Sequence, residues 1–371
     1  MATTIGDLLD TLTTTGELYR KLSEDTIECY ACGHRCKIRE GKRGICQVRF
    51  NEGGELRVPW GYVAALQSDP IEKKPFFHVM PGTNALTFGM LGCDYHCIYC
   101  QNWMTSQAMR DPSSDESINH VRKISPLEMV RLAHRTNAST VVSSYNEPLI
   151  TSEWAVEIFK AAKANGLMCA YVSNGNNTPE VMEYIRPYIS AYKVDLKCMQ
   201  DKNYRKLGGV LQNTLDGIKR AYEMGLWVEI VTLTIPGFND SNEELWDAAR
   251  FIAGVSKDIP WHVTAFHKDY KMTDPDNTDA KTLLRGAEIG REAGLRFVYA
   301  GNLPGQVGEY EDTFCPGCNH RLMRRTGYVI REYHITGDGK CPKCNAQVPG
   351  LWPKDPSQVV LNGLGMPLPV Y

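Results

Sequence analysis

The sequence predicts an α/β fold in which parallel strands and helices alternate to form a partial or full (β/α) barrel, with a small cysteine-rich module at each end. Short β-rich segments alternate with amphipathic helical segments through residues 85–300. Eleven of the 13 cysteines fall into three close groups, one before this region, one near its start and one after it. Repeated strand and helix units of this spacing are typical of a parallel sheet with helical connections, and their number favours a barrel.

Seven segments of the middle region have the composition of strands. They are rich in β-branched and aromatic residues and are bounded by Gly, Asn, Asp and Pro. In barrels of this kind, the active site is built from the loops that follow the carboxyl ends of the strands. We therefore expect functional residues directly after the segments 85–92, 140–145, 168–173, 191–196, 227–235, 262–266 and 296–300.

Six helical segments separate these strands. Several begin with a Ser, Thr or Asp that can cap the helix and end at a Gly, and Ser125 is followed by Pro126 at the first helical position. Such residues predict where a helix begins and where it ends. The predicted helices span residues 125–136, 152–166, 178–186, 214–225, 241–254 and 279–294.

Composition and charge argue against several classes of protein. The formal net charge is −2 at pH 7, and 43% of the residues are hydrophobic. We therefore expect neither a basic nucleic-acid-binding protein nor a disordered chain, and the basic run 320–325 indicates a solvated face. The first residues lack the pattern of a signal peptide, and no segment reaches the ~20 apolar residues of a membrane helix. The sequence predicts a cytoplasmic protein without a membrane partner.

The cysteine groups predict metal sites rather than disulfides, because they are closely spaced in a chain without a secretion signal. The central group, Cys93, Cys97 and Cys100, lies at the end of the first predicted strand. A structural zinc site needs four ligands, so this loop either borrows a fourth, for which His96 is a candidate, or leaves a metal position open. Three thiolates can bind three corners of a [4Fe–4S] cube and leave its fourth iron free.

The central group has the pattern C-x3-C-x-Φ-C, with Tyr99 as the aromatic residue, and it resembles the radical S-adenosylmethionine (SAM) superfamily. The resemblance implies that the three cysteines bind a [4Fe–4S] cluster and that SAM binds the open iron beside Tyr99. It also implies that one electron cleaves SAM to methionine and a 5′-deoxyadenosyl radical, which then abstracts hydrogen from a substrate.

The next two strand ends are similar to SAM-binding segments of that superfamily. The segment SSYNEP implies that Asn146 and Glu147 meet the ammonium group of SAM, although both glycines of the corresponding family segment are replaced here. The segment VSNGN implies that Ser173 and Asn174 bind the ribose and the carboxylate.

Three later segments extend the resemblance. VDLK implies a role near SAM for Asp195, beside a monovalent cation, and for Lys197. TIPGFND implies that Ile235 packs on the adenine, and AFH implies that His267 reaches the ribose. Each of these residues also has an ordinary structural interpretation, as a loop cap, a core residue or an ion pair.

A narrower resemblance rests on GKRGIC, the cysteine loop, VDLK, YRKLGG and a terminal pair of CPxC motifs, and it covers about residues 28–351. This set is similar to the radical SAM proteins associated with the Memo and AMMECR1 proteins, which are related to pyruvate-formate-lyase (glycyl radical enzyme) activating enzymes. The resemblance implies a protein glycine or a small molecule as substrate. It also implies an electron donor such as a flavodoxin or ferredoxin, and Memo or AMMECR1 proteins as partners.

The two flanking groups each offer four thiolates. The terminal CPGC and CPKC knuckles bracket a β-like hairpin, which is the arrangement of a zinc ribbon, and they contain Cys315, Cys318, Cys341 and Cys344. Zinc is the favoured metal here, with an auxiliary iron–sulfur cluster as the alternative. The first group fits zinc or a second, auxiliary iron–sulfur cluster, with a slight preference for zinc, and contains Cys29, Cys32, Cys36 and Cys46.

The predicted organisation therefore has four parts: an N-terminal helix with a cysteine module over residues 1–60, a barrel over 61–310, a zinc-ribbon-like module over 311–350 and a Pro-rich tail over 351–371. The sequence predicts a radical SAM oxidoreductase. Two alternatives are a zinc-rich scaffold without catalytic activity and a radical SAM enzyme that acts on RNA.

Overall fold

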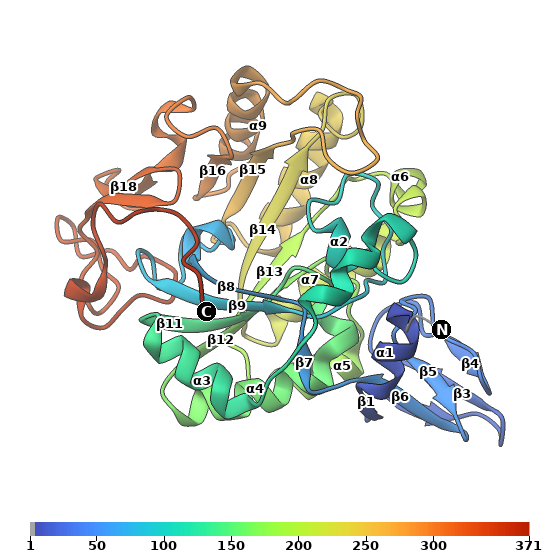
Figure 1. Ribbon diagram of the computed structural model, residues 1–371. Helices are drawn as coiled ribbons and strands as arrows, with labels where there is room; N and C mark the ends of the chain where they lie inside the picture. Colours follow the sequence, from blue (N-terminus) through green and yellow to red (C-terminus); the bar gives the residue numbers. More distant parts are fainter. Residues whose placement is uncertain (1–3, 371) are drawn as a thin grey trace.

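A computed structural model describes residues 4–370, and its centre is one curved sheet of eight strands (Figure 1). Seven of these strands are parallel, and β8 (Ala65–Pro70) pairs antiparallel with β9 (Asn84–Gly89) at one edge. The parallel strands follow the predicted series closely. After β9 they are β11 (Ala138–Ser143), β12 (Met168–Ser173), β13 (Ala191–Asp195), β14 (Trp227–Thr234), β15 (Trp261–Ala265) and β16 (Val298–Gly301).

The sheet is a partial barrel, because its edge strands β8 and β16 do not pair with each other. Part of the exposed side of β8 is covered by the C-terminal tail, in which Leu368 exchanges two backbone hydrogen bonds with Ser68. Strand β8 itself was not predicted, since the sequence ALQSDP is polar and ends in proline. The first predicted strand ends at Gly89, three residues earlier than expected, and the following residues begin the cysteine loop.

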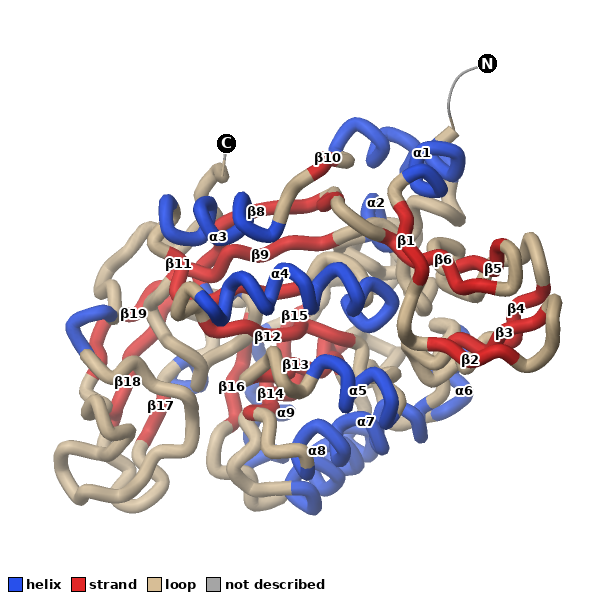
Figure 2. Tube along the Cα trace, turned by 90° about the horizontal axis from the view of Figure 1, so that it is seen from below, coloured by secondary structure: helices blue, strands red, loops and turns tan. Residues whose placement is uncertain are grey.

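The helices cover the outer face of the sheet, as Figure 2 shows. Capping explains where several begin: Ser125, Thr178, Ser241 and Asp279 each accept a hydrogen bond from the backbone N–H three residues later. One predicted start was wrong, because α7 begins at Leu211 rather than near Thr214. The six crossover helices are α3 (Pro126–Arg135), α4 (Ser152–Ala164), α5 (Pro179–Ile185), α7 (Leu211–Glu223), α8 (Asn242–Val255) and α9 (Ala280–Glu292).

Three shorter helices lie outside this series: α1 (Ile5–Thr11), α2 (Trp103–Ser106) and α6 (Asp201–Lys206). None of the helices between residues 4 and 370 has both the length and the apolar composition needed to cross a membrane.

Two small antiparallel sheets form the N-terminal region, drawn in blue in Figure 1. A buried ion pair joins this region to α4: Arg49 and Glu153 lie 2.7 Å apart and are 1% and 2% exposed. The strands are β1 (Thr13–Thr15), β5 (Phe50–Glu52) and β6 (Glu55–Pro59) in one sheet, and β2 (Tyr19–Lys21), β3 (Thr26–Cys29) and β4 (Lys37–Arg39) in the other. A two-stranded pair is formed by β7 (Tyr62–Val63), which precedes the barrel strands in sequence, and β10 (Arg122–Lys123), which lies between β9 and β11.

The C-terminal region, drawn in red in Figure 1, lies on the other side of the barrel from the N-terminal sheets. It contains a three-stranded antiparallel sheet of β17 (Thr313–Phe314), β18 (Arg321–Thr326) and β19 (Val329–Tyr333). Its small apolar core includes Cys315 and Cys341 and packs on Phe77, Phe297 and Tyr299 of the central region. Residues of the central region thus contribute part of the small module's core.

Candidate active site

A cavity of about 330 Å³ lies at the carboxyl ends of the parallel strands. Its walls are the loops after β9, β11, β12 and β13, together with side chains of β14 and β15. Its size lies within the usual range for small-molecule sites. Ten of the twelve residues that the sequence nominates for a cluster and SAM line this cavity: Cys93, Cys97, Tyr99, Cys100, Asn146, Glu147, Ser173, Asn174, Asp195 and Lys197.

The other two nominated residues, Ile235 and His267, are not among the residues that line the cavity. Ile235 is buried in an apolar cluster that also contains Tyr99 and Phe266. His267 is exposed, and its Nε2 lies 2.9 Å from Nε2 of Gln101, which does line the cavity. Both residues flank the cavity, and their contact with SAM stays a prediction.

The cysteine loop leaves β9 through a close contact with the N-terminal region. Gly92 has φ +95°, and a Cβ at this position would lie 2.7 Å from a methyl group of Val48, so only glycine fits. The backbone N–H of Gly92 donates to the carbonyl of Thr105 at 2.9 Å. The side-chain oxygen of Asn146 accepts from the backbone N–H of Met90 at 3.2 Å, which ties the end of β11 to the same loop.

The sulfurs of Cys93, Cys97 and Cys100 do not all lie within 4.8 Å of one another. Tetrahedral zinc holds its thiolates about 3.8 Å apart, because each Zn–S bond is about 2.3 Å long. Within residues 4–370, only one group of three or more metal-binding side chains has all its ligand atoms within 4.8 Å of one another, and these cysteines are not in it. A cube binds each thiolate through a different iron, which spreads the sulfurs apart. This wider arrangement is compatible with an iron–sulfur cluster.

Asp94, directly after the first cysteine, is a buried carboxylate that the sequence analysis missed. Its two oxygens accept hydrogen bonds from Asn174 Nδ2 at 2.7 Å and from Asn176 Nδ2 at 2.8 Å. The side-chain amide of Asn174 is therefore engaged with the cysteine loop and holds it against the end of β12. The signal for this contact was the segment SNGNN, since several neighbouring amides need acceptors once they are buried.

Glu147 follows β11 and lies buried beside the cavity. Its carboxylate accepts hydrogen bonds from Ser173 Oγ and from the backbone N–H of Asn174, both at 2.7 Å. Burial, followed by the nearby charge of Asp94, nevertheless raises the pKa of Glu147 to about 8. A cationic group placed in the cavity would favour the ionised carboxylate.

Asp195, at the end of β13, pairs with two lysines. Lys197 Nζ lies 2.9 Å from one carboxylate oxygen, and Lys193 donates to the other. Burial opposes ionisation of Asp195, but the two ammonium charges outweigh burial and lower its pKa. Lys193 was not nominated, although its place two residues before Asp195 on the same strand puts both side chains on one face.

A second group of lysines lines the side of the cavity next to β8. Lys74 Nζ lies 2.7 Å from Asp69 and 4.2 Å from the ring centroid of Tyr145. Burial lowers the pKa of Lys74 to about 8, despite the charge of Asp69. Lys73 also pairs with Asp69, and Tyr328 from the turn between β18 and β19 lines the same side. These residues could not be nominated from the sequence, because β8 and the hairpin lie outside the series of predicted strands.

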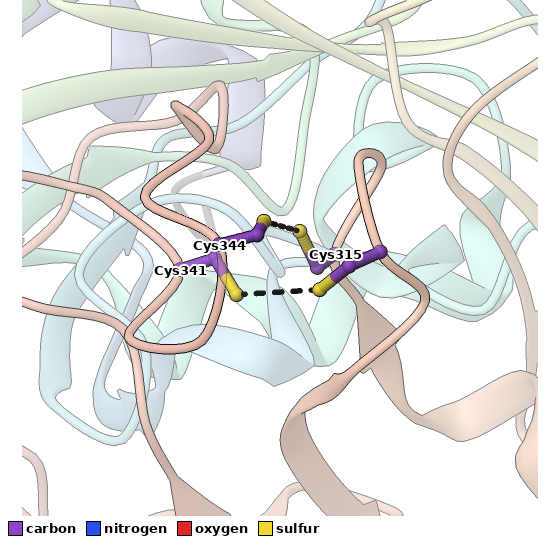
Figure 3. Close-up of side chains that lie close together, drawn as sticks. Cys315, Cys341 and Cys344 are labelled. Carbon is purple, nitrogen blue, oxygen red and sulfur yellow. Dashed lines mark hydrogen bonds between the residues drawn. The ribbon is translucent and has the colours of Figure 1, made fainter.

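The C-terminal cysteine group is compact. Its four sulfurs lie within 4.8 Å of one another, with Cys315 and Cys344 at 3.5 Å and Cys318 and Cys341 at 3.8 Å (Figure 3). These distances fit the tetrahedral zinc expected from the two knuckles. The N-terminal group is wider: no three of its four sulfurs lie within 4.8 Å of one another.

Comparison with known proteins identifies relatives of this chain. The radical SAM superfamily profile matches residues 88–252. The uncharacterized protein MJ0808 of Methanocaldococcus jannaschii is 33% identical over 328 residues, which cover 88% of this chain and 95% of that protein. The pyruvate formate-lyase-activating enzyme of Staphylococcus epidermidis is 26% identical over 203 residues, covering 51% of this chain and 78% of that enzyme.

Among solved structures, a radical SAM methyltransferase from Sphaerobacter thermophilus aligns over 80% of both chains, with a TM-score of 0.44 and 14% identity. The profile match begins within β9. It contains the cysteine loop and the strands β11, β12, β13 and β14. The similarity to the Methanocaldococcus jannaschii protein covers 88% of this chain and so extends well beyond the profile match. The chain therefore belongs to the radical SAM superfamily and is a homologue of the pyruvate formate-lyase-activating enzymes.

Proposed function

We propose that this radical SAM enzyme binds a [4Fe–4S] cluster through Cys93, Cys97 and Cys100 and takes hydrogen from a substrate in the cavity beside them. When bound, the cluster supplies the electron that cleaves SAM to methionine and a 5′-deoxyadenosyl radical. One observation carries the proposal: the three thiols share a single cavity with seven polar or aromatic residues from three further strand ends and the loop itself.

Several residues of the chain are suited to hold SAM. Asn146 and Glu147 offer oxygens for its ammonium group, and the raised pKa of Glu147 means that a cation there would shift this carboxyl toward its ionised form. Lys193 and Lys197 offer positive charge beside Asp195, where the family resemblance would place a monovalent cation. The two ammonium groups can supply the charge that such a cation would bring.

Two classes of substrate are proposed for the cavity. The staphylococcal relative is named a pyruvate formate-lyase-activating enzyme, which favours a glycine of a partner protein as the hydrogen donor. A small anionic molecule is the second candidate, because Lys73, Lys74 and Lys193 line the cavity with only Asp195 and Glu147 as acidic lining residues. We propose a flavodoxin or ferredoxin as electron donor, and Memo or AMMECR1 proteins as partners.

We also propose zinc for the C-terminal group of four cysteines. Bound zinc would stabilise a module whose own apolar core is small. The sulfur distances of 3.5 Å and 3.8 Å support this assignment.

The test is anaerobic reduction of the reconstituted protein with SAM, followed by measurement of 5′-deoxyadenosine. The parent protein should form the product, and Cys97→Ala should form none. Cys169→Ala is the matched control, because Cys169 is a buried thiol of β12 that does not line the cavity. Equal yields from Cys97→Ala and the parent would contradict the proposal, as would a parent protein that holds zinc but no iron.

A further inference from the structure

The N-terminal cysteine group has the residues of a metal site, and no three of its four sulfurs lie within 4.8 Å of one another. All four predicted ligands are thiols, which belong to Cys29, Cys32, Cys36 and Cys46. Within the described chain, the C-terminal group meets the spacing of one tetrahedral ion, whereas neither this group nor the cysteine loop does. The N-terminal group and the cluster-binding loop thus share only the property of being less compact than the C-terminal group.

Backbone hydrogen bonds bring the segments of Cys29, Cys36 and Cys46 together beside the small β2–β3–β4 sheet. Cys29 ends β3, and its N–H donates to the carbonyl of Cys36 just before β4 at 2.9 Å. Cys46 lies in the turn that follows, and the sulfur of Cys36 accepts from the N–H of Ile45 at 3.5 Å. Cys29, Cys32 and Cys46 are buried, and Cys36 is half-buried. A site of this kind is screened from solvent, as iron–sulfur clusters of low potential often are.

The group lies directly against the candidate active site. The N–H of Gly33, next to Cys32, donates to the carbonyl of Asn176 at 2.8 Å. The side chain of Asn176 donates in turn to Asp94 at 2.8 Å, and Asp94 is bonded to Cys93. Two hydrogen bonds and a few covalent bonds therefore connect Cys32 to the first cysteine of the cluster loop.

Two further contacts support this proximity. A Cβ on Gly92, which precedes Cys93, would lie 3.1 Å from the carbonyl oxygen of Cys46. The ring of His34 packs edge-on against Tyr95 of the cluster loop, with their centroids 6.3 Å apart. The two cysteine groups thus belong to one packed unit.

We infer that Cys29, Cys32, Cys36 and Cys46 bind a second iron–sulfur cluster, which passes electrons to the cluster at Cys93, Cys97 and Cys100. An external low-potential flavin or iron–sulfur protein reduces the second cluster by one electron. That electron then moves to the SAM-binding cluster, which returns the second cluster to its oxidised state. The metal assignment stands on the N-terminal residues alone, and the relay role rests on the proposed function.

The metal assignment is tested in a triple variant, Cys93→Ala with Cys97→Ala and Cys100→Ala, which removes the first cluster and leaves the N-terminal thiols intact. After anaerobic reconstitution, the parent should hold about eight irons and the triple variant about four, since each cube contains four. The reduced triple variant should show a cluster signal in electron paramagnetic resonance. Adding Cys29→Ala and Cys36→Ala to it should abolish both iron and signal.

A triple variant without iron that holds a second zinc would overturn the assignment. This outcome is independent of SAM cleavage, so it is distinct from a failure of the proposed function. Cys169→Ala should keep the iron content of the parent, because that thiol belongs to the core of the barrel.

The relay role is tested with Cys36→Ala, the change at the half-buried position. Formation of 5′-deoxyadenosine is measured once with reduced ferredoxin and once with titanium(III) citrate. The rate with ferredoxin is then divided by the rate with titanium(III) citrate. The division removes any general loss of folded enzyme. The ratio should fall about tenfold or more relative to the parent if the second cluster receives electrons from the protein donor. An unchanged ratio would exclude the relay.

Discussion

The two flanking cysteine groups offer the same four thiols but differ in spacing and surroundings. The C-terminal sulfurs are compact and partly exposed, and they lie in a module with its own small apolar cluster. The N-terminal sulfurs are wider, mostly buried and joined through Asn176 and Asp94 to the cluster loop. Equal numbers of ligands therefore do not imply equal roles. The C-terminal group fits a structural ion, and the N-terminal group fits a cofactor that works with the active site.

Removal of the C-terminal metal should have the largest effect. Structural zinc contributes roughly 10 kcal/mol to folding in small domains, so Cys341→Ser should unfold residues 311–350 locally. Limited trypsin digestion should then cleave at the arginines of β18, while the barrel stays intact. Turnover of substrate should fall, because Tyr328 lines the cavity from this hairpin. A hairpin that resists trypsin after Cys341→Ser would show that the metal is not what holds this module together.

The second effect concerns the attachment of the N-terminal region to the barrel. Arg49→Met leaves Glu153 buried without its partner, which should lower the free energy of unfolding by about 3–5 kcal/mol. The matched control is Arg20→Met, which breaks an ion pair in which the arginine side chain is 66% exposed and should change stability by about 1 kcal/mol or less. Urea unfolding of both variants measures the difference. Equal losses would mean that the buried pair does not join the two regions.

The third effect concerns the link between the N-terminal cysteine group and the loop of Cys93, Cys97 and Cys100. Asp94→Asn places an amide against Asn174 and Asn176, so at least one buried hydrogen bond is lost, at a cost of about 1–3 kcal/mol. Iron bound at Cys93, Cys97 and Cys100 should become easier to remove with a chelator. The exposed Asp201→Asn serves as control. A variant with the chelation rate of the parent would separate Asp94 from cluster retention.

The smallest effect is a pH dependence of the affinity for SAM, caused by Glu147 in the cavity. The pKa of Glu147 is raised to about 8 in the folded protein, so its contribution to stability is present below pH 4.5 and is lost as the pH rises through 8. The ammonium group of SAM favours the ionised form, so its affinity should increase modestly between pH 6.5 and pH 8.5. Isothermal titration of the parent and of Glu147→Gln measures this slope. The same slope in both proteins would assign it to another group.

Much of the architecture follows from local signals. The alternation of β-rich and amphipathic segments predicted all seven parallel strands, and four of the capping residues accept the expected hydrogen bonds. Strand β8 and the C-terminal tail were not assigned to the sheet, because their pairing depends on contacts between Ser68 and Leu368, distant in sequence. Short polar edge strands carry little hydrophobic periodicity by which to be recognised.

The candidate site shows the same limit. Residues at strand ends could be nominated because parallel strands carry their carboxyl ends to one side of a sheet, and ten of them do line one cavity. Lys74 and Tyr328 could not be nominated, since they enter the cavity from the edge strand and from the C-terminal hairpin. Asp94 was passed over because its role depends on two asparagines from another strand end.

The sequence by itself determined the order of strands and helices, the number of thiols in each group and the loop that carries the three central cysteines. These features depend on residue type and on spacing along the chain. Only the tertiary structure decided that the barrel is open, that lysines line the same cavity as the cysteines and that one group of four thiols is more compact than the other. Distance and burial arise from packing between remote segments, and they select which metal a given set of ligands can hold.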